Sequence, residues 1–487
     1  MMTPPKTAGR RAPRLRTGAA RGWLAAMALS LFAPAAMADT LADALAGAYN
    51  TSGLLEQNRA LLRAADEDVA STVADLRPII SWSTDITRSY NRRSGGVGAG
   101  AGAGLGNTSS GATNLNAGIT AEWLLYDFGR TPLSIDAAKE LVLATRQSLI
   151  GIEQQVLLRA VQAYMNVQRN TRFVALRENN VRVINESLRA AQDRFEVGEV
   201  TRTDVAQAEA RLSLSRSNLA TARGDLERAI EEYVSVVGKR PGALERAPSL
   251  PRLTRTEEAA KQVALRSHPE MLAAQYNVSA AKLNVLVAEA AMKPRVSLNA
   301  SVGVSERLNG DSESETGNFG IQIGGPIYQG GALSSAKRRA FAQRDAQLGE
   351  LHQTRDQIRQ NVGVAYAILE SARASAEASA EQVRAGRVAF DGVNEEANLG
   401  ARTTLDVLNA EQEFLDAQAN QISAEADVII AAYSVLESTG ELTVRNLNLA
   451  VQTYDPSAYY NLVNDAPAAL SERGRSLDRV LRKIGNQ

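Results

Sequence analysis

Two stretches of the sequence repeat one set of turn and capping residues, and they are the strongest candidates for a functional site. The first reads FEVGEVTRTDVAQAEA and the second EANLGARTTLDVLNAE. Gly198 and Gly400 suit a left-handed helix end, since glycine has no side chain to clash there. Each glycine is followed by a threonine and an aspartate with the spacing of a helix capping box, Thr201 with Asp204 and Thr403 with Asp406. The chemistry expected of these carboxylates is hydrogen bonding that begins a helix.

Residues that commonly catalyse reactions or bind metals are scarce in this sequence. It has no cysteine and two histidines, His268 and His352, which lie far apart in helical patterns. A histidine metal site and a Ser/His/Asp triad are therefore not supported. The G-x-G spacing in the stretch 91–114 is not followed directly by a helix, so it predicts a flexible loop rather than a nucleotide site. We expect no enzymatic activity, no cofactor and no metal.

The chain is an internal duplication. Matched residues lie 202 positions apart over more than a hundred residues, and further upstream the offset becomes 216 because the first copy has a longer glycine-rich insert. The matched pairs are Tyr126 with Tyr328, Tyr164 with Tyr366, Asp204 with Asp406, Gly238 with Gly440, and Pro78 with Pro294. We expect a first structural repeat at 39–238, a proline-rich linker at 239–253, a second repeat at 254–440 and a polar C-terminal tail at 441–487.

The first 38 residues have the pattern of a secretory signal peptide. Six basic residues precede the short apolar run from Trp23 to Ala33, and small residues precede the expected cleavage after Ala38. Cleavage leaves 48 basic residues against 54 acidic ones, a net charge of about −6, so nucleic acid is not an expected partner. The absence of cysteine excludes disulfides and an N-terminal lipid-bearing cysteine.

Four segments alternate between apolar and polar residues with a period of two, which predicts β-strands. They form one strand pair at 79–126 and another at 295–328, each joined by a polar loop. In the first segment Ile80, Trp82 and Ile86 share one face, and Ser81 and Asp85 share the other. A soluble sandwich with one buried face explains the alternation equally well. Export, the missing cysteines and the polar loops favour a wall with lipid outside and water inside.

Four strands do not close a barrel, because unpaired backbone groups in lipid cost several kcal/mol each. Two chains would provide eight strands and a filled interior, whereas three would provide twelve and room for a water-filled lumen. A homotrimer is therefore favoured. Long helical patterns adjoin the strands, and the one from Pro132 to about Glu196 would extend roughly 90 Å as a helix. Helices are also expected over residues 40–76 and 254–292, and a short basic helix is expected near 477–484. The sequence predicts a barrel continued by a helical tube.

With these features the chain resembles the TolC family of outer-membrane channel proteins. The resemblance covers the duplication, the four strands, the Tyr-x-x-Gly strand exits and the two helix turns at Gly198 and Gly400. It implies an α+β membrane protein, with a trimeric 12-stranded barrel in the outer membrane of a Gram-negative bacterium. A long α-helical coiled-coil tunnel would continue the barrel into the periplasm and close at its far end.

The resemblance also implies a periplasmic gate. The family's gating positions correspond to Thr203 and Asp204 in the first hairpin, and to Arg402, Asp406 and Asn409 in the second. An acidic ring linked by arginine can hold helix ends inward, and we expect Arg402 to pair with Asp204. Two positions depart from the family's best-known member, since Asn409 replaces an aspartate and Ala397 replaces a tyrosine. We therefore expect fewer hydrogen bonds in the closed state.

The helix tips resemble the family's docking sites for a periplasmic adaptor, or membrane fusion protein. They comprise Val197, Gly198 and Glu199 in the first hairpin, and Leu399, Gly400 and Ala401 in the second. The turns require glycine whether or not an adaptor binds there.

The function implied is an exit duct for an inner-membrane ABC or RND transporter. In lacking a lipidated cysteine, the chain resembles the family branch associated with type I protein secretion more than the lipoprotein efflux branch, and the alternative is multidrug efflux. A different class of function is a trimeric structural or adhesive surface protein without a lumen.

Overall fold

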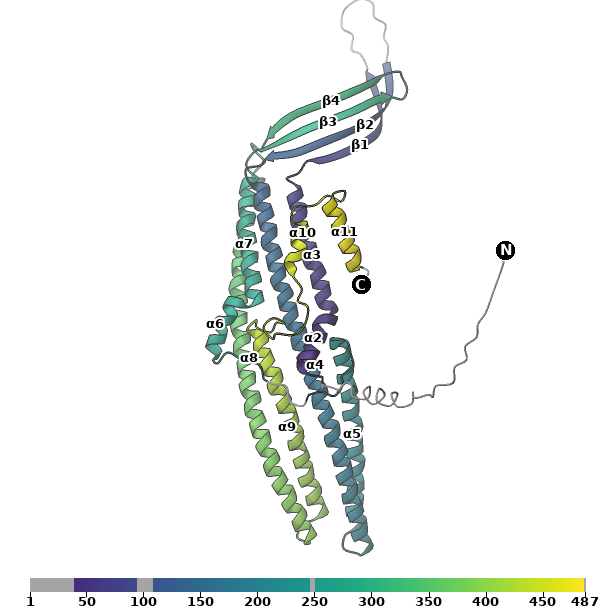
Figure 1. Cartoon of the computed structure of the whole chain (residues 1–487), viewed down its shortest axis with the longest axis vertical. Coiled ribbons are helices and arrows are strands. Elements are labelled where there is room, and N and C mark those ends of the chain that lie inside the picture. The colour runs from purple at the N-terminus through teal and green to yellow at the C-terminus, as the bar shows by residue number, and fades with distance from the viewer. Residues whose placement is uncertain (1–38, 94–107, 246–249, 486–487) are drawn as a thin grey trace, which may run out of the picture.

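The computed structural model describes residues 39–93, 108–245 and 250–485. The predicted signal peptide at 1–38, the glycine-rich part of the first loop at 94–107 and four linker residues at 246–249 lie outside the described residues. A four-stranded sheet occupies one end of the molecule, and the long helices extend away from it to the other end (Figure 1).

The predicted duplication is confirmed, because both repeats contain two helices, two strands and two helices in the same order. The first repeat consists of α2 (Leu41–Thr51), α3 (Gly53–Ala74), β1 (Ile79–Arg93), β2 (Thr108–Tyr126), α4 (Arg130–Glu196) and α5 (Arg202–Val237). The second consists of α6 (Glu257–Ser267), α7 (Pro269–Ala290), β3 (Arg295–Arg307), β4 (Glu313–Gly324), α8 (Ala332–Asn398) and α9 (Thr404–Ser438). The helices α10 (Pro456–Val463) and α11 (Glu472–Gly485) follow.

The four strands form one antiparallel sheet in the order β1-β2-β3-β4, so the two repeats join at β2 and β3. Strands β1 and β4 are its two edges. The second strand pair was predicted to end at Tyr328, but β4 ends earlier, at Gly324. Pro326 follows, and proline has no N–H to continue the ladder.

Helices α4 and α8 contain 67 residues each and run about 100 Å. Helices α5 and α9 return beside them, so that α4–α5 and α8–α9 form two helical hairpins whose tips lie at the end opposite the sheet (Figure 1). Inside a helix every backbone N–H and C=O group is hydrogen-bonded, so a longer helix has no more unpaired backbone groups than a short one. In the part of the chain that the structure describes, no helix combines the length and apolarity needed to cross a membrane.

Two continuous helices predicted from the sequence are each broken in the structure, so those predictions were wrong. The helix predicted over residues 40–76 breaks at Ser52, whose backbone is extended and whose hydroxyl accepts a hydrogen bond from Leu55 N at 3.3 Å. The helix predicted over residues 254–292 breaks at His268. His268 precedes Pro269, and a residue before proline is restricted to extended conformations.

The main core is thin and lies where α2 meets the middle of α4 and the C-terminal ends of α5 and α9. Tyr164 and Tyr233 are fully buried there among alanine, leucine and valine side chains. The duplicated tyrosines make equivalent bonds, because Tyr164 Oη donates to Asp39 O at 3.0 Å and Tyr366 Oη donates to Thr254 O at 2.7 Å. Each tyrosine thus ties a long helix to the beginning of its own repeat.

The predicted polar tail at 441–487 packs against the helices. Leu442 and Val444 are buried in the main core, and Val463 of α10 is buried against α3. Tyr459 Oη also donates to Glu67 of α3 at 2.6 Å. The basic helix predicted near 477–484 lies within α11, beside the upper part of α3 (Figure 1).

Candidate functional site

The sheet separates two environments. Residues that pair directly across neighbouring strands lie on the same face of the sheet. Successive pairs along the strands alternate between mainly apolar and mainly polar residues, as the sequence predicts. The apolar face carries large exposed side chains, and Trp82, Phe319 and Ile323 are 79%, 78% and 72% exposed. An exposed apolar surface of this kind on a sheet suits contact with lipid.

The other face carries a network of polar side chains. The Asn116 side-chain amide donates to Asp85 Oδ2 at 2.9 Å, and Ser305 Oγ donates to Asn116 Oδ1 at 2.7 Å. On β3 and β4 the Asn299 side-chain amide donates to Gln322 Oε1 at 2.9 Å. This face suits water, so the sheet is a wall between lipid and an aqueous space.

Both strand pairs continue into long helices through the same glycine turn. Gly129 and Gly331 precede α4 and α8 with φ of +86° and +88°, a conformation that favours glycine. In the first turn Asp127 Oδ2 accepts hydrogen bonds from Thr131 N at 2.7 Å and from Thr131 Oγ1 at 2.6 Å. The repeated Tyr-x-x-Gly motif therefore redirects each strand pair into a helix on the same side of the sheet.

The tips of the two hairpins have the turn geometry expected from the sequence. Gly198 and Gly400 have φ of +81° and +79°. The N–H groups of Glu199 and Ala401 bond back to carbonyls five residues earlier, as in a Schellman motif. Val197 is 71% exposed and Leu399 is 85% exposed, so each tip presents one apolar side chain to solvent.

The two aspartates of the motifs cap helices within their own hairpins. Asp204 Oδ2 accepts from Thr201 N at 2.8 Å and from Thr201 Oγ1 at 2.7 Å. Asp406 Oδ2 accepts from Thr403 N at 3.0 Å and from Thr403 Oγ1 at 2.8 Å. These hydrogen bonds hold the pKa of both carboxyls below the ordinary value. Both aspartates are therefore ionised at neutral pH.

The other residues assigned to the gate lie close to these caps. Arg402 Nε lies 2.8 Å from Glu396 Oε2, an ion pair within the second hairpin. Thr203 is exposed at the beginning of α5. In the described part of this single chain, no ion pair joins Arg402 to Asp204. That pairing remains a prediction for the assembled protein.

Polar contacts between the two hairpins involve the predicted gate residue Asn409 and three residues that the sequence did not single out, Arg211, Asn180 and Glu411. Asn409 Oδ1 accepts from Arg211 Nη2 of α5 at 2.9 Å. The side-chain amide of Asn180 on α4 donates to Glu411 Oε1 of α9 at 3.0 Å. Farther from the tips, Arg169 and Arg172 of α4 also pair with Asp427 and Glu425 of α9. We refer to the two contacts nearer the tips, of Asn180 with Glu411 and of Arg211 with Asn409, as the inter-hairpin contacts. They lie beside an apolar cluster of Ile184, Leu188, Ala191, Ala208, Leu212 and Leu408.

Glu411 is the unusual member of this set, because its side chain is a buried carboxylate. It is 6% exposed, and Oε2 has no hydrogen-bond partner among the described residues. Burial raises the pKa of Glu411 to about 7, against the lowering effects of Asn180 and Arg211. A sequence signal did exist, since Glu411 lies between Leu408 and Leu415 at core spacing on α9.

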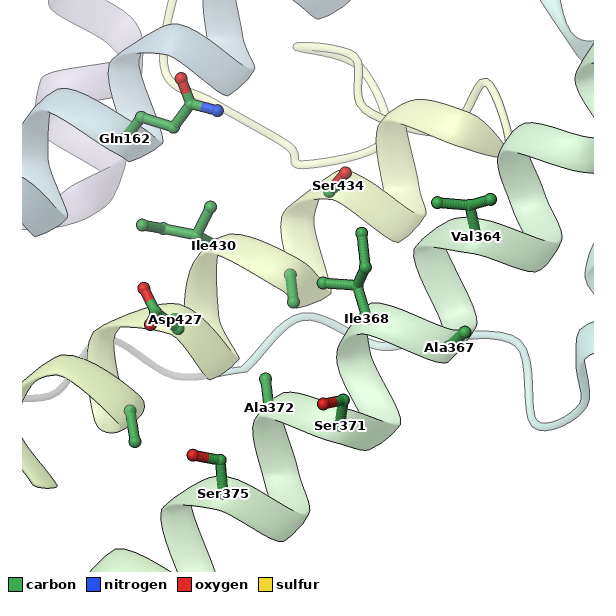
Figure 2. Close-up of a pocket in the computed structure, with 12 residues that line it drawn as sticks. Gln162, Val364, Ala367, Ile368, Ser371, Ala372, Ser375, Asp427, Ile430 and Ser434 are labelled. Carbon is green, nitrogen blue, oxygen red and sulfur yellow. The ribbon is translucent and has the colours of Figure 1, made fainter. Parts of the chain in front are cut away.

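A shallow groove runs between α8 and α9, farther from the hairpin tips than the inter-hairpin contacts. Figure 2 shows the side chains that line it. Ile368 and Val364 of α8 are 54% and 50% exposed there, beside Ser371 and Ser375. The nearby Asp427 is paired with Arg169 of α4 at 3.3 Å. The groove holds no acid and base pair, and its small side chains suit the packing of another helix.

In the described ranges, no group of three or more His, Cys, Asp or Glu residues is placed to hold a metal ion. His268 caps α7, with Nδ1 accepting from Glu270 N at 3.3 Å. His352 is exposed on α8.

Comparison with known proteins agrees with this geometry. The sequence profile described as outer membrane efflux protein matches residues 48–239 and 260–441. The outer membrane efflux protein BepC of Brucella suis biovar 1 is 38% identical over 433 residues, covering 88% of this chain and 92% of BepC. The alkaline protease secretion protein AprF of Pseudomonas aeruginosa is 26% identical over 310 residues, covering 62% of this chain and 64% of AprF.

The fold also matches a solved structure. The crystal structure of CusC, described in terms of transmembrane channel formation, superposes with a TM-score of 0.72 over 83% of this chain and 92% of CusC, at 18% identity. The predicted fold class, with four strands per chain in a trimeric barrel continued by a helical tunnel, is that of such channels. The chain belongs to the outer membrane efflux protein family and is an outer-membrane channel with a large periplasmic portion, not an enzyme.

Proposed function

We propose that three copies of this chain form the exit duct of a tripartite export system. The observation that carries the proposal is the four-stranded wall, with one apolar face, one polar face and two unpaired edges. Neighbouring copies pair these edges and enclose water, because a wall with open edges is unstable in lipid. The helices leave the wall on one side and extend the enclosed space into the periplasm.

The groove of Figure 2 supports the same assembly. Ile368 and Val364 are half-exposed on a face lined by small side chains, and a helix of a neighbouring copy fills that space. The helical tunnel is then a closed ring of hairpins, with each chain contributing two.

The tips of the hairpins form the gate of the duct. Asp204 and Asp406 are ionised and lie at the first turns of α5 and α9. In the trimer they form rings of negative charge, and Arg402 joins neighbouring hairpins by exchanging Glu396 for Asp204. Thr203 lies beside Asp204 in the same ring. The inter-hairpin contacts hold the two hairpins of one chain together, and Asn409 takes part through Arg211.

A periplasmic adaptor docks on the hairpin tips. Val197 and Leu399 are exposed apolar side chains at the two turns, next to Gly198 and Gly400. An adaptor that contacts both tips connects the duct to an inner-membrane ABC or RND transporter.

The exported material is protein, passed in unfolded form as in type I secretion. Two facts support this assignment, namely the absence of cysteine and the similarity to AprF, which is named for alkaline protease secretion. The second candidate is efflux of small toxic compounds, favoured by the similarity to BepC, which is named as an efflux protein.

Deletion of the gene followed by two assays separates the candidates. Type I secretion predicts that one or more proteins disappear from the culture medium, and that the intact gene restores them. Drug efflux predicts an unchanged set of secreted proteins, with greater sensitivity to dyes and detergents.

Gate function is tested by replacing Arg402 with alanine in the complemented strain. The change removes the ion pair with Glu396 and any link to Asp204, so leakage of large antibiotics into the cells is expected to rise. Arg384→Ala is the matched control, because Arg384 pairs with Glu381 within α8, away from the tip. Unchanged permeability of the Arg402 variant would refute the gate assignment.

A further inference from the structure

The two edges of the sheet carry opposite charges at the end farthest from the helices. On the apolar face of β1, Arg88 is exposed, and its guanidinium carbon lies 5.1 Å from the centroid of the Tyr90 ring. On the same face of β4, Glu313 and Glu315 are exposed. Within the described residues neither glutamate has an ion pair. The edges that remain unpaired in one chain are therefore complementary in charge.

A third glutamate adds to the need for a cation here. Glu306 of β3 is the direct partner of Glu313 of β4, on the apolar face. Like charges directly opposite each other destabilise a sheet. A basic side chain from outside the chain would relieve this repulsion.

The tilt of the strands determines which residues of β4 in one copy meet which residues of β1 in the next copy. Partners across the sheet run from Ile79 of β1 to Gly320 of β4, but β4 continues four residues further toward the helices and ends at Gly324. Strands in a closed barrel tilt, so each strand is displaced along its neighbour. We take the strand ends nearest the helices to lie at one rim of the barrel. The three steps from β1 to β4 then displace the paired residues by about four positions along the strand. The fourth step, from β4 to β1 of the next copy, adds about one or two.

This displacement brings the charged residues together. Within one chain, Glu315 lies in line with Thr84. In the next copy it lies about five or six residues beyond Thr84, and the even displacement of about six places it opposite Tyr90. Odd displacements are excluded, because they would place the apolar face of one copy beside the polar face of the next. Arg88, two residues before Tyr90 on the same face, is thus the diagonal neighbour of Glu315, within about 8 Å.

We infer that Arg88 of one copy and Glu315 of the next form an ion pair on the outer surface of the barrel, where β1 meets β4. The pair fixes the register of the closing strands, since a shift by two residues in the wrong direction moves Arg88 away from both Glu313 and Glu315. The site lies near the rim of the wall, where a charge facing lipid costs little compared with the midplane. The inference rests on the proposed trimer.

Chemical cross-linking tests the pairing, because the chain has no cysteine of its own. The variant with Arg88→Cys and Glu315→Cys is purified in detergent and treated with a thiol cross-linker that spans about 8 Å. Covalent trimers are expected after heating in SDS. The matched control combines Arg88→Cys with Thr316→Cys, since Thr316 lies on the polar face opposite Gly303. The control is expected to remain as monomers after heating.

A charge reversal gives an independent measure. Arg88→Glu is expected to lower the temperature at which the trimer dissociates in SDS, and Arg88→Glu with Glu315→Arg is expected to restore it. Trimers that never cross-link through Arg88→Cys and Glu315→Cys would overturn the pairing while leaving the duct proposal intact. A protein that is monomeric in native detergent solution would overturn both.

Discussion

Replacing Glu411 by glutamine should change how the stability of the hairpins depends on pH. The Glu411 carboxyl is buried, and burial raises its pKa from the ordinary 4.5 to about 7. Below pH 4.5 the group is neutral in both the folded and the unfolded chain. Between pH 4.5 and 7 the unfolded chain loses this proton and the folded chain keeps it, so stability falls as the pH rises.

The magnitude follows from the size of the pKa shift. A rise from 4.5 to about 7 corresponds to about 3 kcal/mol of stability, lost between those pH values and absent above them. Glutamine is neutral at every pH and keeps the oxygen that accepts from Asn180. Its amide nitrogen replaces the unpartnered Oε2, which costs about 1 to 2 kcal/mol. Above pH 7 the variant is therefore expected to be more stable by about 1 to 2 kcal/mol.

Circular dichroism of the helices, followed during heating at several pH values, measures this effect. The natural protein should lose more thermal stability than Glu411→Gln between pH 5 and pH 7.5. Glu413→Gln is the matched control, because it removes a carboxylate from an exposed position two residues away. Parallel pH profiles for the natural protein and Glu411→Gln would refute the reasoning, as would an equal effect of the control.

Three further changes test the wall, the tips and the packing of the repeats. Ile321→Arg places a charge on the apolar face at a cost of about 2 to 4 kcal/mol and should reduce the trimer recovered from outer membranes, whereas Asn318→Arg on the polar face should be tolerated. Gly400→Ala forces a left-handed turn on alanine and should lower thermal stability by about 1 kcal/mol, whereas Gly224→Ala inside α5 should raise it. Tyr164→Phe removes the bond to Asp39 O and should lower the free energy of unfolding by about 1 kcal/mol; an unchanged midpoint would show that the bond contributes nothing.

The features that were predictable from the sequence depend on local patterns. Strand faces follow from alternation, so the sequence places Trp82 and Asp85 on opposite faces, as in the structure. The turns at Gly198 and Gly400 follow from the need for glycine at positive φ, and the caps from the spacing of threonine and aspartate.

The features that were not predictable depend on contacts between distant parts of the chain. Asn180 and Glu411 lie 231 residues apart, and nothing near either residue indicates the other. The helix break at Ser52 was missed because serine also occurs within helices, and only its extended backbone marks the cap. The packing of the tail depends on Val463 meeting α3, which composition alone does not reveal.

The central claim is that copies of this chain enclose a water-filled path through the outer membrane. Single-channel recording from the purified protein in a planar lipid bilayer tests it most directly. We predict discrete steps of ionic current, with a larger or longer-lived open state when Arg402 or Asp204 is replaced. A protein that inserts into the bilayer as a trimer but never conducts, with or without those replacements, would contradict the claim.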